Sequence, residues 1–281
     1  MMGGRFRLDV AFDGTGFWGW QVQPDRHTVQ GELARALTQM GESAVPTGAG
    51  RTDAGVHALL LPTHADLERD WSETELARAL GSLLPPEISL LRAARVEDSF
   101  HARFGASSRT YHYVLGVEHN PFFHSRRWSR DRLPEADWAR EELADVIGEH
   151  DFSSFTKSGS SSGTPRAQVL AADWLEFPDG AILTVTADHF FYGMVRALTG
   201  AVVRGSQDGA DRGHLQKILK QRDRAAAGEA APAAGLYLTD VHYPGEPKGA
   251  DRTGTVLKIA GLGIPSPFPG SREKKTANEN A

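Results

Sequence analysis

The sequence predicts an α+β protein of two similar halves, and three observations support that prediction. Apolar and polar residues alternate in several short stretches, which is typical of strands with one buried face. Between these stretches, apolar residues recur every three or four positions, which is typical of amphipathic helices. The order strand, helix, strand, strand, helix, strand in the first half is echoed in the second. We therefore expect each half to be a mainly antiparallel sheet with helices on one face, and an active-site cleft between the halves.

The elements of the first half follow from apolar alternation and from capping residues. A strand is predicted at residues 5–13, where every second residue is apolar. Thr28 is the expected N-cap of a helix whose apolar face runs to Met40. Residues 72–75 have the sequence of a capping box, and two prolines end the helix that it opens. The remaining expected elements are two strands that flank residue 53, the second ending near residue 66, and a strand at residues 88–96.

The second half repeats this pattern. Pro134 suits the first turn of a helix, because the amide hydrogen that proline lacks is not needed there. The tripeptide 178–180, Pro-Asp-Gly, is a turn signal between two strands. We divide the chain into an N-terminal domain at residues 1–103 and a C-terminal domain at residues 104–244. The expected strands of the second domain lie at residues 110–117, 166–177, 181–190 and 236–243, and its expected helices begin at 134, span 191–203 and include 215–219.

Residues 245–281 differ in composition from the rest of the chain. Ten of them are glycine or proline, and the last part is rich in charged residues. Such a composition buries too little apolar surface to fold by itself, so we expect a disordered tail. Residues 256–259 are the one apolar stretch there, with the composition to add a strand or a weak contact.

Composition excludes several classes of function. The chain of 281 residues has no cysteine, which excludes disulfides, thiolate nucleophiles, iron–sulfur clusters and cysteine-bound zinc. It has no run of about 18 apolar residues and no apolar signal-peptide core near Met1, so we expect a cytoplasmic protein without a membrane segment. No sequence motif of a nicotinamide, phosphate-loop or metal site occurs, so we expect no cofactor and no metal.

The charged residues give evidence both for and against a nucleic-acid partner. The net charge is −5, which counts against a nucleic-acid partner, but 24 of the 31 basic residues are arginine. Arginine matches phosphate geometry and stacks on bases, so this bias suits RNA, and a GC-rich coding genome explains it equally well. RNA binding depends on local positive surface rather than on total charge, so composition alone does not establish whether the protein binds RNA, and the sequence motifs are needed.

A glycine-bounded turn at residues 50–58 is the most informative stretch of the chain. Gly50 and Gly55 flank Asp53 and leave room for a ligand to come close. The β-prone residues on both sides predict that the turn joins two strands and presents the Asp53 carboxylate on a rigid base. A lone aspartate in such a turn more often only satisfies backbone amides, so the wider pattern is needed.

That wider pattern resembles the tRNA pseudouridine synthase A family. The stretch Gly-Arg-Thr-Asp-Ala-Gly-Val-His-Ala at residues 50–58 is similar to the catalytic loop of that family. An ordered set of motifs is far more specific than one motif alone. The chain departs from the family at Gly193, where a histidine is expected before Met194. The other stretches that resemble family motifs, in the family's order, lie at residues 12–21, 28–33, 100–104, 109–113, 151–156 and 191–196.

The resemblance implies roles for particular residues. Asp53 is the expected nucleophile or electrostatic stabiliser at the sugar carbon, with Arg51 as the cation that orients it or fills the space left by the extruded uridine. Tyr111 is expected to stack on the target uracil and to move a proton through its hydroxyl. Arg196 is expected to face the active site and to pair with Asp53 or a phosphate. The residues assigned to contact with the RNA backbone are Arg103, Arg109, Arg126, Arg127, Arg130 and Arg204.

The implied activity is isomerisation of uridine to pseudouridine on the 3′ side of the anticodon stem-loop of tRNA, by a homodimer. The reaction is redox-neutral and needs no external energy, which agrees with the expected lack of a cofactor. Two alternatives remain: a non-catalytic RNA-binding or RNA-folding protein on the same scaffold, and an aspartate-nucleophile phosphatase. The second is suggested by Asp9 and Asp13, although these are four residues apart and no partner lysine is evident.

Overall fold

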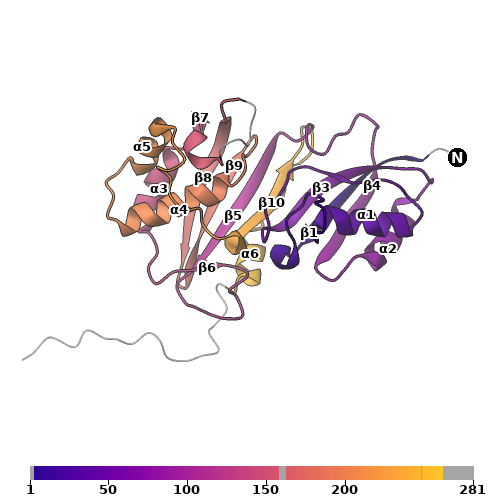
Figure 1. Ribbon diagram of the computed structural model, residues 1–281, viewed down its shortest axis with the longest axis horizontal. Helices are drawn as coiled ribbons and strands as arrows, with labels where there is room; N and C mark the ends of the chain where they lie inside the picture. Colours follow the sequence, from indigo (N-terminus) through magenta and orange to yellow (C-terminus); the bar gives the residue numbers. More distant parts are fainter. Residues whose placement is uncertain (1–2, 158–162, 248, 262–281) are drawn as a thin grey trace, which may run out of the picture.

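The computed structural model describes residues 3–157, 163–247 and 249–261. Figure 1 shows a central sheet flanked by helices. The strands are β1 Gly4–Phe12, β2 Thr47–Gly48, β3 His57–Leu67, β4 Ile88–Arg95, β5 Ser108–Gly116, β6 Trp128–Ser129, β7 Gly148–Asp151, β8 Arg166–Phe177, β9 Gly180–Ala187 and β10 Leu236–His242. The helices are α1 Val29–Gln39, α2 Glu73–Leu83, α3 Ala136–Ala144, α4 Met194–Gln207, α5 His214–Gln221 and α6 Thr253–Ile259. No helix in these ranges is both long enough and apolar enough to cross a membrane.

One sheet runs through both halves of the molecule. Its strand order is β4-β1-β3-β10-β5-β9-β8-β7, with β2 paired to β3 and β6 paired to β5. Strands that neighbour each other along this order are antiparallel, except where β10 pairs with β3. There His57 lies opposite Tyr237 and Ala58 lies opposite Leu238. The predicted α+β class is confirmed, and this short parallel pairing joins the two halves into a continuous sheet.

The predicted helix starts in the first half are confirmed. The Thr28 side chain accepts a hydrogen bond from the amide of Gly31, which satisfies one of the free N–H groups at the start of α1. Ser72 and Glu75 make both bonds of the capping box at the start of α2. These boundaries depend on neighbouring residues only, which is why the sequence could predict them.

Two boundaries in the second half differ from the expectation. Helix α3 starts after Pro134, because the Glu135 carboxylate caps the amides of Asp137 and Trp138, and it ends at Ala144 before strand β7 begins. Helix α4 begins at Met194 rather than at residue 191, because Gly193 has a left-handed φ of 73° that cannot continue a helix.

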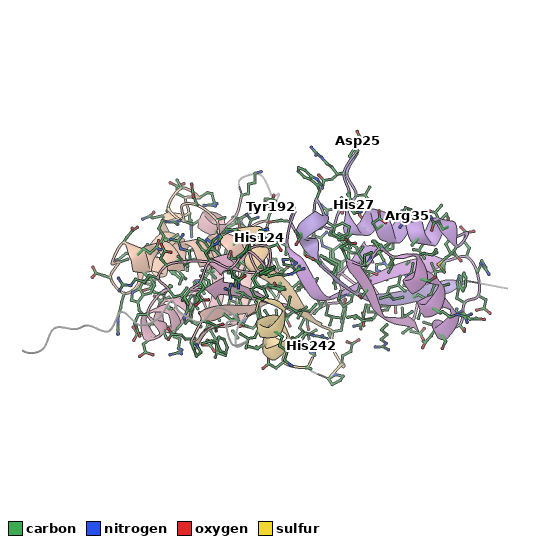
Figure 2. All side chains as sticks on the ribbon, turned by 90° about the horizontal axis from the view of Figure 1, so that it is seen from below. Asp25, His27, Arg35, His124, Tyr192 and His242 are labelled. Atoms are coloured by element: carbon green, nitrogen blue, oxygen red, sulfur yellow. The ribbon has the colours of Figure 1, made fainter. Side chains whose placement is uncertain are left out.

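Helices α1 to α5 cover one face of the sheet, as predicted. Phe6 of β1 is buried in one cluster with Leu37 of α1 and Leu76 of α2. Tyr113 of β5 is buried in another cluster with Val202 of α4. In Figure 2 the purple helix α1, which carries the labelled Arg35, lies along the upper side of the molecule.

Helix α6 lies on the opposite face and corrects the expectation of a disordered tail. Its Val256 is buried with Val114 and Tyr237, which are strand residues that point away from the other helices. Figure 2 shows this yellow helix below the sheet. The tail prediction is therefore wrong for α6. Residues 248 and 262–281 of the predicted tail lie outside the described part of the chain.

Candidate active site

Asp53 lies in a loop that the neighbouring backbone holds closely. The loop joins β2 to β3, and its turn is closed by a hydrogen bond of 3.2 Å from the Val56 amide to the Asp53 carbonyl. The Trp20 amide donates to the Thr52 carbonyl at 3.1 Å. A Cβ added to Gly19 would lie 2.4 Å from that same carbonyl oxygen, so only glycine permits this approach. The carboxylate is therefore presented by a fixed backbone.

The cation that pairs with Asp53 comes from the other half of the molecule. Arg196, in the first turn of α4, places one guanidinium nitrogen 3.1 Å from the Asp53 carboxylate, and its Nε donates to the Ala231 carbonyl. The two side chains are 15% and 24% exposed. Burial raises the pKa of Asp53, and the charges of Arg196 and Lys157 oppose that rise. The site thus combines a desolvated carboxylate with a cation that favours its charged form.

Tyr111 lies on strand β5 on the same face as the helices. Its ring meets Phe190 edge-on, with centroids 5.0 Å apart, and only 9% of the residue is exposed. Burial, with a further contribution from the negative charge of Asp53, raises the pKa of its hydroxyl. That hydroxyl is therefore protonated at neutral pH, and it makes no hydrogen bond to the described residues. It is free to serve a substrate beside Asp53.

Arg51 does not make the first of its two expected contacts, the one with the Asp53 carboxylate. Its side chain is exposed, and no hydrogen bond or ion pair connects it to Asp53 or to any other described residue. The position beside the carboxylate is taken by Arg196. A guanidinium in water gains little by moving to a carboxylate that is already paired. The structure therefore assigns the orienting cation to Arg196 and leaves Arg51 free at the surface.

Arg109 is also placed differently from the expectation of an RNA contact. Its guanidinium donates to four backbone carbonyls, those of Ala49, Arg103, Ala106 and Asp188, at distances between 2.6 and 3.1 Å. Ala49 is the first residue after β2, at the start of the Asp53 loop. Arg109 is thus a clamp that ties this loop to β9 and to the connection between the halves, with both of its terminal nitrogens engaged by backbone carbonyls.

The other arginines expected to contact RNA form two groups: those whose guanidinium lies over an aromatic ring, and those whose guanidinium is engaged by a carboxylate or by backbone carbonyls. Arg103 is exposed, with its guanidinium over the Phe104 ring. Arg126 pairs with Asp13, and Arg204 donates to the carbonyls of a neighbouring loop. Arg127 and Arg130 lie over the rings of Phe123 and Trp128.

Lys157 was missed by the sequence analysis. Its charge acts on Asp53, its amide donates to the Tyr192 carbonyl at 3.4 Å, and its ammonium lies 5.5 Å from the centre of the Tyr192 ring. The available signal was its position directly after the motif at residues 151–156.

The two carboxylates that suggested a phosphatase are engaged separately. Asp9 is buried in an ion pair with Arg7, at 2.7 Å. Asp13 accepts from Thr15 and pairs with Arg126, and with His57 these partners lower its pKa against the opposing effect of burial. Neither carboxylate lies in the arrangement that a nucleophile and a neighbouring acid would need, so the structure does not favour that alternative.

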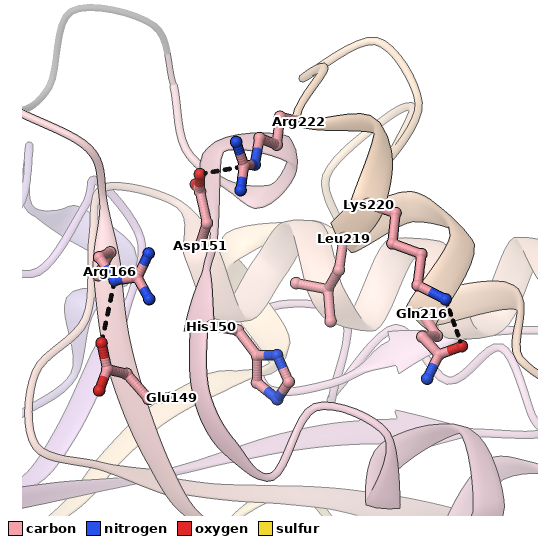
Figure 3. A pocket seen from close by; sticks show the side chains of 8 residues that line it. All are labelled: Glu149, His150, Asp151, Arg166, Gln216, Leu219, Lys220 and Arg222. Carbon is pink, nitrogen blue, oxygen red and sulfur yellow. Dashed lines mark hydrogen bonds and ion pairs between the residues drawn. The ribbon is translucent and has the colours of Figure 1, made fainter.

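The two measured cavities lie away from Asp53. One, of about 430 Å³, lies between β7, the start of β8 and α5 (Figure 3). Its charged side chains are largely engaged with one another: Arg222 with Asp151, and Arg166 with Glu149. The other, of about 340 Å³, lies behind the sheet beside α6. Neither of these two cavities includes Asp53, and within the described ranges no three acidic, histidine or cysteine side chains are grouped to hold a metal ion.

Comparison with known proteins defines the class to which this fold and site belong. The sequence model of the tRNA pseudouridine synthase family matches residues 143–244. The chain is 36% identical to tRNA pseudouridine synthase A of Maridesulfovibrio salexigens, over 85% of this chain and 90% of that protein. It is 39% identical to the protein of the same name from Paraburkholderia xenovorans, again over 85% of this chain and 90% of that protein.

A third relative, tRNA pseudouridine synthase A of Bacillus pumilus, is 36% identical over 85% of this chain and 99% of its own length. The chain therefore belongs to the tRNA pseudouridine synthase A family, and the predicted family is confirmed. A solved structure of a Cbf5-Nop10-Gar1 complex is a weak match, at 13% identity with a TM-score of 0.38, over 83% of this chain and 48% of that chain.

Proposed function

We propose that this protein isomerises uridine to pseudouridine in tRNA, with Asp53 as the nucleophile. The observation that carries the proposal is the partly buried carboxylate of Asp53, fixed by its loop, paired with Arg196 across the two halves and adjacent to Tyr111. A protein that only binds RNA has no need of a desolvated carboxylate beside a free phenol. The names of the curated relatives agree with a tRNA substrate.

The chemistry follows from these three side chains. An Asp53 oxygen attacks C1′ of the ribose while the bond from C1′ to N1 breaks, and the electron pair of that bond passes to the uracil ring. The ring turns, C5 bonds to C1′, and the bond from C1′ to Asp53 breaks, which restores the carboxylate. The Tyr111 hydroxyl takes the proton from C5 as it passes its own proton on toward N1, so the hydroxyl ends protonated and the product is an isomer of the substrate. Arg196 holds Asp53 in the charged form before the attack and after release.

The finer parts of the proposal rest on the family resemblance. The target uridines are those on the 3′ side of the anticodon stem-loop, and the working form is a cytoplasmic homodimer. Two subunits would form a joint groove from exposed arginines such as Arg51 and Arg103, which removes the objection raised by the net charge of −5.

The test is to incubate the purified protein with unmodified tRNA and to map pseudouridine by chemical labelling and primer extension. Wild-type protein is expected to modify the anticodon stem-loop, and Asp53→Asn is expected to bind tRNA without turnover, because the amide keeps the shape and loses the nucleophile. Binding without any pseudouridine in the wild type would favour the non-catalytic alternative. Full activity of Asp53→Asn would remove Asp53 from the mechanism.

A further inference from the structure

Two exposed aromatic side chains, each with a cation over its ring, are connected to the Asp53 site from opposite halves of the molecule. Trp18 is 50% exposed, and the guanidinium carbon of Arg26 lies 3.9 Å from the centre of its ring. Tyr192 is 53% exposed, and the Lys157 ammonium lies over its ring. A single exposed ring needs no explanation, but the connection of both rings and both cations to the Asp53 site does.

Both rings are linked to the catalytic loop by short stretches of backbone. Trp18 precedes Gly19, whose backbone lies against the carbonyl of Thr52, and the amide of Gly55 donates to the residue before Trp18 at 3.2 Å. Trp18 is further fixed by a bond of 2.8 Å from its amide to the His27 carbonyl. The first ring therefore moves with the N-terminal side of the site.

Tyr192 is connected to the other side of Asp53. It lies four residues before Arg196, the ion-pair partner of Asp53, and its carbonyl accepts from Lys157, whose charge also acts on Asp53. In Figure 2 the loop with Asp25 and His27 and the side chain of Tyr192 lie along the same upper edge of the molecule. The two rings thus come from opposite halves and lie on the same side of the sheet.

We propose that Trp18 and Tyr192 are stacking platforms for the two nucleotides that flank the target uridine, an inference that rests on the proposed function. A uridine that leaves its stack deprives both neighbouring bases of a stacking partner. An aromatic ring on each side replaces that partner with any base, because every base has a π face. Arg26 and Lys157 make no ion pair with a carboxylate of the described residues, so both charges are available to the adjoining phosphates.

The test uses full-length protein carrying Asp53→Asn, so that tRNA binding is measured without turnover. In that background Trp18→Ala and Tyr192→Ala are each expected to weaken the Kd for unmodified tRNA by roughly 5- to 150-fold, as loss of one stacked base predicts. Trp18→Phe and Tyr192→Phe keep a ring and are expected to restore most of the affinity. Alanine variants that bind within about twofold of the parent, or phenylalanine variants as weak as alanine, would overturn the proposal.

A second readout separates stacking from general loss of folding. With 2-aminopurine at either nucleotide beside the target uridine, binding is expected to quench its fluorescence, and Trp18→Ala and Tyr192→Ala should each abolish quenching on one side only. Arg69→Ala is a matched control for Arg26→Ala, because Arg69 lies over the ring of Trp71 at 4.2 Å, at the far end of the N-terminal half. Equal losses of tRNA affinity in Arg69→Ala and Arg26→Ala would contradict the proposal.

The outcomes distinguish this inference from the proposed function. Wild-type protein that forms pseudouridine while the Trp18 and Tyr192 variants bind and quench like their parent would refute the platforms alone. Wild-type protein that forms no pseudouridine in tRNA would overturn the proposed function and this inference with it. A change in oligomeric state of the alanine variants, with unchanged RNA affinity, would assign the rings to a protein contact and refute the platforms.

Discussion

At the scale of single residues, the hydroxyl and the ring of Tyr111 are expected to have separate roles. Tyr111→Phe keeps the ring and its edge contact with Phe190 and is expected to bind tRNA with a turnover rate about 10²- to 10⁴-fold lower, the usual loss when a general acid or base is removed. Tyr111→Ala removes both roles and should weaken binding as well. Single-turnover rates and the Kd for tRNA measure the two effects. A fully active Phe variant would show that the hydroxyl has no chemical role.

Asp53→Asn is expected to make the fold more stable at neutral pH. Burial raises the pKa of Asp53, so the folded protein holds this proton more tightly than the unfolded chain does. The free energy of unfolding therefore falls as pH rises from the unfolded pKa through the folded pKa, and the uncharged amide escapes that loss. Thermal unfolding across pH should show an advantage of the variant at neutral pH that disappears in acid. An advantage that grew in acid would contradict the raised pKa.

At the scale of elements, the Arg109 clamp is expected to control the catalytic loop. Arg109→Lys keeps the charge but cannot reach four carbonyls, and it is expected to cost about 1–3 kcal/mol of stability through unsatisfied hydrogen bonds. Because the Ala49 carbonyl is released at the start of the Asp53 loop, kcat should fall more than tRNA affinity does. Urea unfolding and single-turnover kinetics measure both. A lysine variant that weakens only tRNA binding would return Arg109 to the role of a phosphate contact.

The elements that the sequence predicted are those defined by adjacent residues. The capping box at Ser72 and the N-cap at Thr28 are local signals, and the alternation along β1 records a face buried on the helices. The two-residue strands β2 and β6 carry no periodicity at all. Helix α6 lies in a glycine-rich and proline-rich segment and is stabilised by the tertiary burial of Val256, which composition does not reveal.

The candidate site shows the same difference between features defined by adjacent residues and features defined by tertiary contacts. Asp53 and Tyr111 were found through motifs, each contained in one stretch of chain. The pairing of Asp53 with Arg196 joins residues 143 positions apart, so it was expected from the family resemblance and not from any spacing in the sequence. Arg51 is only two positions from Asp53, but no hydrogen bond or ion pair of the described residues connects the two side chains. Proximity along the chain did not identify the ion-pair partner of Asp53, because that partner, Arg196, comes from the opposite half of the molecule.

At the scale of the whole molecule, tRNA binding is expected to weaken steeply with salt despite the net charge of −5. Four exposed cations around the site, Arg26, Arg51, Arg103 and Lys157, make no ion pair with a carboxylate of the described residues. Each phosphate that one of them neutralises contributes about −0.7 to −0.9 to the slope of log K against log salt. A salt titration of the wild type and of single alanine variants should show each variant with a shallower slope. A flat titration would exclude a basic groove.

Strand β10 is the last strand of the described chain to be synthesised, yet it lies at the centre of the sheet between β3 and β5. While the ribosome is still making the chain up to residue 236, both of these strands have an open edge whose backbone groups can pair with another chain. Insertion of β10 completes the sheet between the two halves, beside the loop that carries Asp53. The loop of Asp53 is therefore synthesised long before the strand that completes the sheet beside it. A chain released before β10 is complete contains Asp53, Tyr111 and Arg196 but lacks the central strand between β3 and β5.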